Sequence, residues 1–117
     1  MNPLFREYLE EVKAQGSNLK VKLEQEISEL DFVITSVQAE LDVVSDALDC
    51  EYDQDPVSKK FLTTILELNQ EYNERLSSLY SNKTQVKLRL EECNRECSIA
   101  ERLLNESDGD SNHSADL

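Results

Sequence analysis

Residues 48–56, LDCEYDQDP, separate two long stretches of helix-forming sequence, and this interruption decides the fold. Carboxylates stand at alternate positions here and repel one another: Asp49, Glu51, Asp53 and Asp55. Asp55-Pro56 joins a residue that caps helix N-termini to a proline suited to the first helical turn. The sequence therefore predicts a turn over residues 49–55 and a new helix that starts at residue 56.

On both sides of this turn, apolar residues recur at alternating steps of three and four, which turns one narrow stripe of each helix toward a neighbouring helix. We call these stripes the first and the second seam. The first seam consists of Phe5, Tyr8, Val12, Gly16, Leu19, Leu23, Ile27, Leu30, Ile34, Val37, Leu41, Val44 and Leu48. The second seam consists of Phe61, Ile65, Leu68, Tyr72, Leu76, Leu79, Lys83, Val86, Leu90, Cys93, Cys97, Ala100 and Leu104. Because nearly all positions outside the seams are charged or polar, the pattern is typical of coiled-coil pairing and indicates association.

The predicted helices cover residues 3–48 and 56–105, which at 1.5 Å per residue span about 69 Å and about 75 Å. A short connection favours antiparallel neighbours, and helices of matched length can pair from end to end. Gly16-Ser17 could restart the first helix. We favour one continuous helix, because the first seam passes through Gly16 with only one phase slip. The predicted fold is all-α, an extended antiparallel helical hairpin over residues 1–106.

The last residues break the seam pattern. From Ser107 onward, Asp, Ser, Gly, Asn and His replace the apolar periodicity. Such composition cannot bury enough apolar surface to offset the entropy of ordering the chain. The sequence therefore predicts a disordered acidic tail over residues 107–117.

The charge of the chain restricts its partners. With 25 acidic and 12 basic residues, the formal net charge is −13. Nucleic acid and anionic membrane both require a basic surface, so neither is expected as a direct ligand. Residues 3–48 hold ten acids and four bases, a balance of −6, whereas residues 56–105 hold seven acids and eight bases, a balance of +1. This difference favours pairing the two helices with each other over pairing the acidic helix with itself.

Targeting signals and cysteine usage indicate a compartment. No segment approaches the run of about 18 apolar residues that a membrane helix needs. The N-terminus lacks a basic region followed by an apolar one, so no secretory signal is predicted. Three cysteines without a framework pattern indicate a reducing environment. We therefore expect a soluble cytoplasmic protein without direct membrane insertion.

The sequence offers little on which catalysis or cofactor binding could be built. It contains no Gly-rich phosphate loop and no Ser-His-Asp set, so we expect no enzyme, no catalytic residues and no cofactor. A calcium loop of the EF-hand type needs Gly at its sixth position and Glu at its twelfth. Counting from Asp49, those positions hold Gln54 and Lys60. The alternating acids are therefore interpreted as a solvated, helix-breaking turn.

Cys93 and Cys97 lie four residues apart on the second seam. Cysteine packs as a small hydrophobic residue, and burial in the seam is the favoured interpretation. A redox-sensitive thiol pair and a metal site are the alternatives, but zinc would need two more ligands and the only histidine is His113. No metal site is predicted. Lys83, the only charged residue on the second seam, either fixes the register of pairing or lays its aliphatic stem along the seam while its ammonium reaches water.

The start of the second helix resembles a known family. Residues Asp55-Pro56-Val57 and Lys60-Phe61-Leu62, followed by Leu66, Leu68, Tyr72 and Leu76, resemble the pattern of snapin-type small coiled-coil subunits. The resemblance implies a subunit of the complexes that organise lysosomes and lysosome-related organelles. Some subunits of this kind associate with SNAREs. The small helical-hairpin chaperones of bacterial type III secretion look almost as similar, being acidic and of comparable length with an Asp-Pro break.

These observations lead to one functional hypothesis and one alternative. The chain is expected to be a non-catalytic coiled-coil subunit of a multi-subunit cytoplasmic assembly in vesicle or lysosome-related trafficking, with other coiled-coil proteins as hetero-oligomeric partners. The alternative is a small chaperone that masks the helix of a client. In either case, we expect the partner to contact the seam at Leu30, Ile34, Val37, Leu41, Ile65, Leu68, Tyr72, Leu76, Leu79, Val86 and Leu90.

Overall fold

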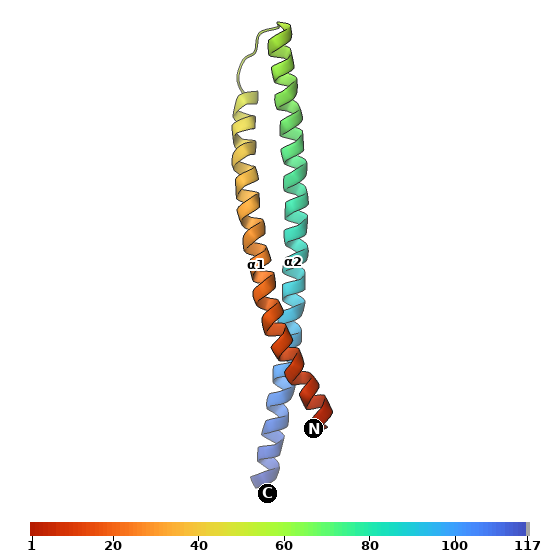
Figure 1. The fold of residues 1–117 in the computed structure, drawn as a ribbon. Coiled ribbons are helices and arrows are strands. Elements are labelled where there is room, and N and C mark those ends of the chain that lie inside the picture. The colour runs from red at the N-terminus through yellow and green to blue at the C-terminus, as the bar shows by residue number, and fades with distance from the viewer. Residues whose placement is uncertain (117) are drawn as a thin grey trace. The chain divides into compact units, whose positions relative to one another are not determined.

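The computed structural model describes residues 1–116, and it describes side chains for residues 1–107. Over this range the chain forms two helices and no strand: α1 (Pro3–Leu48) and α2 (Pro56–Asp116), as Figure 1 shows. The predicted all-α class is confirmed. α1 passes through Gly16 without interruption, as the continuity of the first seam suggested, and Gly16 keeps a negative φ.

Local hydrogen bonds mark the beginnings of both helices. The Asn2 Oδ1 accepts the backbone N–H of Leu4 at 2.8 Å, which satisfies one of the free donors of the first turn of α1. At the start of α2, Asp55 Oδ1 accepts the backbone N–H of Ser58 at 2.7 Å, and Asp55 Oδ2 accepts the Ser58 hydroxyl at 3.2 Å. Asp55 is thus the N-cap of α2 that the Asp-Pro pair predicted.

The connection between the helices is held by Tyr52. Its hydroxyl donates to the backbone carbonyl of Ala47, one of the carbonyls that the last turn of α1 leaves without a helical partner. The Tyr52 ring also contacts the ring of Phe61, with centroids 5.7 Å apart and planes tilted by 54°. Phe61 belongs to the predicted second seam, but it is 55% exposed and packs against the connection.

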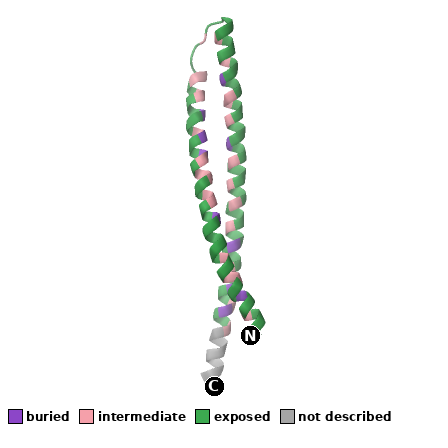
Figure 2. Ribbon diagram, viewed as in Figure 1, coloured by how far each residue is buried: buried purple, intermediate pink, exposed green. Residues whose placement is uncertain are grey.

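The chain divides into two compact units, each built from parts of both helices. Unit 1 combines Met1–Glu26 with Val86–Leu117, and unit 2 is Ile27–Gln85. Within each unit, a segment of α1 lies antiparallel to a segment of α2 (Figure 1). Figure 2 shows that the buried residues face the neighbouring helix, whereas the opposite sides are exposed. The single hairpin domain over residues 1–106 stays a prediction.

Each unit has its own core. In unit 1, Leu9, Ala100 and Leu104 form a buried cluster against which Val12 and Leu103 pack. The core of unit 2 is a buried cluster on which partly buried residues pack. Its buried members are Ile34, Val37, Leu41 and Leu76, and its partly buried members are Val33, Tyr72 and Leu79.

The N-terminal part of the first seam differs from the prediction. Leu9 is buried at 5% exposure, while Phe5 and Tyr8 are 45% and 60% exposed. Leu9, Val12 and Gly16 continue the alternation of three and four toward the N-terminus. The sequence interpretation instead chose a step of four from Val12 to Tyr8, which rotates the stripe away from α2. The prediction that Phe5 and Tyr8 belong to the first seam is therefore wrong.

The C-terminal end of α2 also differs from the prediction. The helix continues to Asp116, beyond the end near residue 105 that the loss of apolar periodicity suggested. Apolar periodicity reports packing, whereas helical backbone bonding needs only available N–H groups, and no proline follows Pro56 to remove one. The side chains of residues 108–117 lie outside those described, so the predicted disordered acidic tail stays a prediction.

Candidate interaction surfaces

The structure places the predicted partner-binding residues against the other helix of the same chain. The buried ones are Ile34, Val37, Leu41, Ile65 and Leu76, all in unit 2. The partly buried ones are Leu30, Leu68, Tyr72 and Leu79 in unit 2, and Val86 and Leu90 in unit 1. Because one helix can cover only one stripe of its neighbour, the edges of this seam stay open to solvent. Those open edges are the first candidate interaction surface.

Polar contacts at the seam of unit 2 fix how its two helices align. The Lys83 ammonium forms an ion pair with the Asp31 carboxylate of α1, and the Lys83 side chain is 22% exposed. Nearer the connection, the Asn69 amide donates to the Ser45 hydroxyl at 3.3 Å. Lys83 thus combines both interpretations of its position, since its stem is partly buried in the seam and its charge has a defined partner.

Tyr72 adds a third polar contact across unit 2. Its hydroxyl bonds to the carboxylate of Glu40 on α1. This hydrogen bond, together with the negative charge of Glu40, raises the pKa of Tyr72 above its ordinary value. The phenol is a donor at neutral pH even at its ordinary pKa, so the raised pKa extends the contact with Glu40 to more alkaline solutions.

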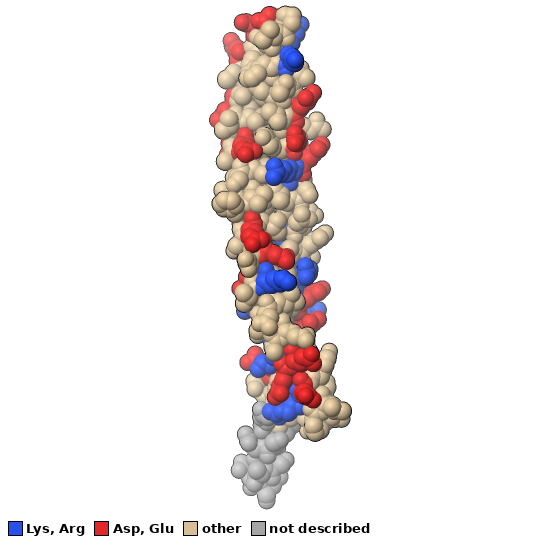
Figure 3. All heavy atoms as spheres, viewed as in Figure 1, with Lys and Arg blue, Asp and Glu red and all other residues tan. Residues whose placement is uncertain are grey.

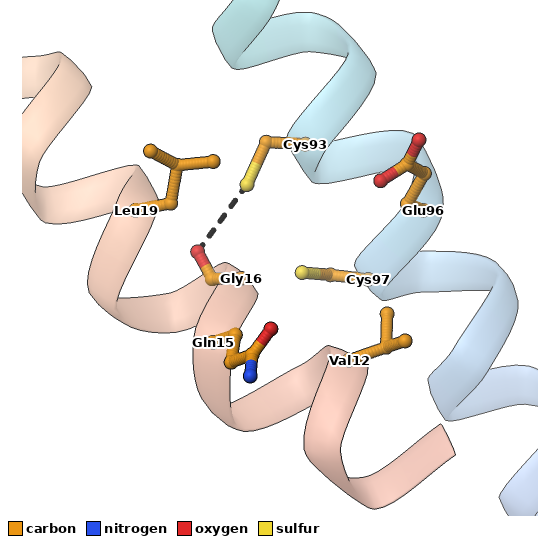
Figure 4. Close-up of a pocket in the computed structure, with 7 residues that line it drawn as sticks. All are labelled: Val12, Gln15, Gly16, Leu19, Cys93, Glu96 and Cys97. Atoms are coloured by element: carbon orange, nitrogen blue, oxygen red, sulfur yellow. Dashed lines mark hydrogen bonds between the residues drawn. The ribbon is translucent and has the colours of Figure 1, made fainter. Parts of the chain in front are cut away.

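Gly16 is the point of close helix approach in unit 1. The Cys93 thiol donates to the backbone carbonyl of Gly16, with 3.2 Å between Sγ and O (Figure 4). A β-carbon at position 16 would collide with Cys97 Sγ, so the thiol fills the space that the missing side chain leaves. Val12, Gln15, Leu19 and Glu96 complete the lining of this small cleft.

The chemistry of the cysteines follows from their surroundings. Cys93 is buried, at 5% exposure. This burial raises the pKa of its thiol, and the charge of Cys97 and a hydrogen bond with Cys97 raise it further. A raised pKa keeps the thiol protonated and lowers its reactivity. Cys50, in contrast, is exposed within the connection between the helices. Within the described part of the chain, no three His, Cys, Asp or Glu side chains lie together in a way that could hold a metal ion.

Sequence reasoning missed a second candidate surface, on the side of α1 that faces away from α2. Phe32 and Val43 are 75% and 69% exposed, and Ser36 and Ala39 between them are exposed as well. At about 100° per residue, these four residues share one side of α1, opposite the seam. We call Phe32, Ser36, Ala39 and Val43 the outer face of α1. The same alternation of four and three, applied to uncharged residues outside the seam, would have found it.

The charges around α1 in unit 2 have one sign. Residues 27–48 hold five acids and no Lys or Arg. The acids are Glu29, Asp31, Glu40, Asp42 and Asp46. Figure 3 shows acidic and basic side chains spread over the displayed side of the protein, with uncharged surface between them. A partner that covers the outer face of α1 therefore meets apolar surface bordered by carboxylates.

Neither described helix combines the length and the apolar character that crossing a bilayer requires. Comparisons with models of protein families, with curated proteins and with solved structures gave no match. The open seam edges and the outer face of α1 are therefore the observations from which a function can be argued.

Proposed function

We propose that the protein is a non-catalytic coiled-coil subunit of a multi-subunit cytoplasmic assembly, with other coiled-coil proteins as its partners. One observation carries this proposal. Among the described residues, fourteen large apolar side chains are exposed, compared with ten apolar side chains that are buried. The chain on its own therefore leaves more large apolar side chains exposed than buried, and further ones are only partly buried. The resemblance to snapin-type subunits suggests vesicle or lysosome-related trafficking as the process.

The energetics of a helix pair support association. Small folds with little core usually need a staple or a partner. The described cysteines are free thiols, so no disulfide strengthens this fold. Burying one exposed Leu, Val or Phe side chain contributes about 1.5–3 kcal/mol. A partner that covers several of them therefore offers stabilisation comparable to that of a marginal domain.

The spacing of these groups favours helical partners. Single exposed apolar residues are ordinary on protein surfaces, but the partly buried residues Leu30, Leu68 and Leu79 belong to a heptad seam and leave part of that seam open to solvent. A further helix laid along this open part would interdigitate with them as knobs into holes. This geometry favours a coiled-coil partner over a flat or concave one.

A small chaperone remains the second candidate, because the outer face of α1 with its bordering acids could mask a single client helix. The two functions differ in stoichiometry. A subunit stays in its assembly together with several coiled-coil proteins in fixed ratios. A chaperone holds one client and is absent from the mature structure that the client joins.

The test is purification of the tagged chain from its native host, followed by native mass spectrometry. We expect several coiled-coil proteins in constant ratio to the chain. One client that leaves upon assembly would favour the chaperone, and recovery of the chain alone would contradict both functions. A matched pair of variants locates the contact: Leu68→Asp at the seam should lose the partners, whereas Glu71→Lys at an exposed position of the same helix should retain them.

A further inference from the structure

We propose that the outer face of α1 binds one amphipathic helix of a partner protein, and that this helix carries basic residues on both sides of its apolar stripe. This inference rests on the proposed function, because it names the chemistry of one partner. It starts from four residues of unit 2 that the helix pair leaves uncovered: Phe32, Ser36, Ala39 and Val43.

The geometry of the outer face matches a helical partner. Its residues are spaced four, three and four apart, so they form a straight stripe of three turns, about 17 Å long at 1.5 Å per residue. The buried residues Ile34, Val37 and Leu41 lie on the opposite side of α1, against α2. The helix pair therefore neither covers nor uses this stripe. A helix with apolar residues at the same spacing can align with it over its whole length.

Hydroxyl groups near the stripe do not oppose its burial. The Thr35 hydroxyl donates to the backbone carbonyl of Asp31 at 2.8 Å, and the Ser36 hydroxyl donates to that of Phe32 at 3.1 Å. Both donors keep their partners when another helix excludes water. A buried donor without a partner would cost about 1–3 kcal/mol, and these two avoid that cost.

Charge determines which helix fits. At about 100° per residue, Glu29 and Glu40 border the outer face on one side, and Asp42 and Asp46 border it on the other. No Lys or Arg occurs between residues 27 and 48, and Lys83 of α2 pairs with Asp31. A partner helix with Lys or Arg beside its apolar stripe places opposite charges along both borders. Surface ion pairs add little energy individually, so the apolar stripe supplies affinity and the charges select the partner.

The same charges disfavour a second copy of this chain on the outer face. Two outer faces in contact would bring together two segments that each carry five acids and no base. Like charges placed opposite one another across an interface are repulsive. α2 of a second copy is also a poor match, since residues 56–85 carry four bases and three acids, a balance of only +1.

The experiment titrates the full chain against two synthetic helical peptides of about 21 residues, long enough to form a helix on contact. Both peptides carry Leu at steps of three and four. One has Lys at the flanking positions and the other has Glu there. Fluorescence anisotropy gives the dissociation constants at low and high salt. We expect the Lys peptide to bind, to weaken with added salt, and to bind at least about tenfold more tightly than the Glu peptide.

Matched variants identify the binding surface. Phe32→Ser should weaken binding of the Lys peptide by at least about tenfold, and Asp42→Lys should weaken it and reduce its salt dependence. Leu66→Ser is the control, because Leu66 is also exposed, at 52%, but belongs to α2 of the same unit. Its binding should stay within about twofold of the wild type. Circular dichroism should show the same helicity for all variants, since each changes an exposed side chain.

Three results would overturn the proposal: equal binding of both peptides, unchanged binding by Phe32→Ser, or an equal loss in Leu66→Ser. A dimer that excludes the Lys peptide and becomes a monomer in Phe32→Ser would assign the outer face to a second copy and would also overturn it. Purification of Phe32→Ser from the native host separates this inference from the proposed function. If that variant retains every partner, the function stands and the outer face is excluded; if the wild type brings no partner, the function itself fails.

Discussion

Gly16 and Cys97 share one volume between the helices of unit 1. The Cys97 thiol occupies the place where a β-carbon of residue 16 would lie, and the neighbouring Cys93 donates to the Gly16 carbonyl. Glycine in the middle of a helix lowers stability by about 1 kcal/mol relative to alanine. The chain carries this cost within α1 because the backbone of Gly16 is the surface on which Cys97 packs.

Gly16→Ala should therefore have opposite effects in two backgrounds. In the wild type, overpacking against Cys97 Sγ costs about 1–3 kcal/mol, which outweighs the gain in helix propensity, so the free energy of unfolding should fall. In Cys97→Ala, the new β-carbon would lie 3.9 Å from the β-carbon of residue 97, an ordinary contact. There Gly16→Ala should raise the free energy of unfolding by about 1 kcal/mol. Urea denaturation of all four chains measures the coupling, and additive effects would contradict the shared volume.

Lys83→Leu should raise the thermal midpoint of the protein. Lys83 interrupts an apolar seam, and its ion pair with Asp31, whose side chain is 49% exposed, is screened by solvent. The Asp31 carboxylate that is left behind is half exposed and stays hydrated, so burying a leucine in the seam should contribute more than the screened ion pair does. The control is Lys87→Leu, a change at an exposed position of α2, which should shift the midpoint little. A clear fall in the midpoint of Lys83→Leu alone would show that the ion pair dominates the seam.

Stability should depend on the protonation of Cys93. Burial raises the pKa of this thiol in the folded state. The charge of Cys97 and a hydrogen bond with Cys97 raise it further. The folded state thus prefers the protonated thiol. Its contribution to stability is complete below the unfolded pKa of about 8.5 and is lost as pH rises through the higher folded pKa. Between pH 7 and pH 10, the free energy of unfolding of the wild type should fall more steeply than that of Cys93→Ala, and parallel profiles would contradict this assignment.

Leu76→Ala should destabilise the protein far more than Leu66→Ala. Leu76 is 6% exposed in the core of unit 2, whereas Leu66, on the same helix, is 52% exposed. Truncating a buried leucine costs about 2–5 kcal/mol, and the thin core of a helix pair should place the value near the lower limit. Changes at surface sites usually stay within about 0.5 kcal/mol. Similar losses from both variants, measured by urea denaturation, would mean that the seam is not the core.

The sequence alone predicted the helices and the seam because both depend on local patterns. The cap at Asp55 was sufficient to predict where the second helix begins, and the spacing of three and four from Leu23 onward was sufficient to predict the buried side of each helix. The contact between Gly16 and Cys97 could not be predicted, because heptad spacing selects the buried face of each helix but not the residue opposite. The outer face was missed for another reason: Phe32 and Val43 lie among serine, threonine and alanine, which were counted as polar background.

The contacts that align the helices differ greatly in the length of chain they close. Ser45 and Asn69 are 24 residues apart, whereas Gly16 and Cys93 are 77 residues apart. Forming the longer loop first would cost about 1 kcal/mol more in chain entropy than forming the shorter one. We therefore expect folding to begin beside the connection, where Tyr52 and Asp55 already hold the helix ends, and to reach the paired termini last. Substitutions in unit 2 should then slow folding, while those around Gly16 should mainly accelerate unfolding.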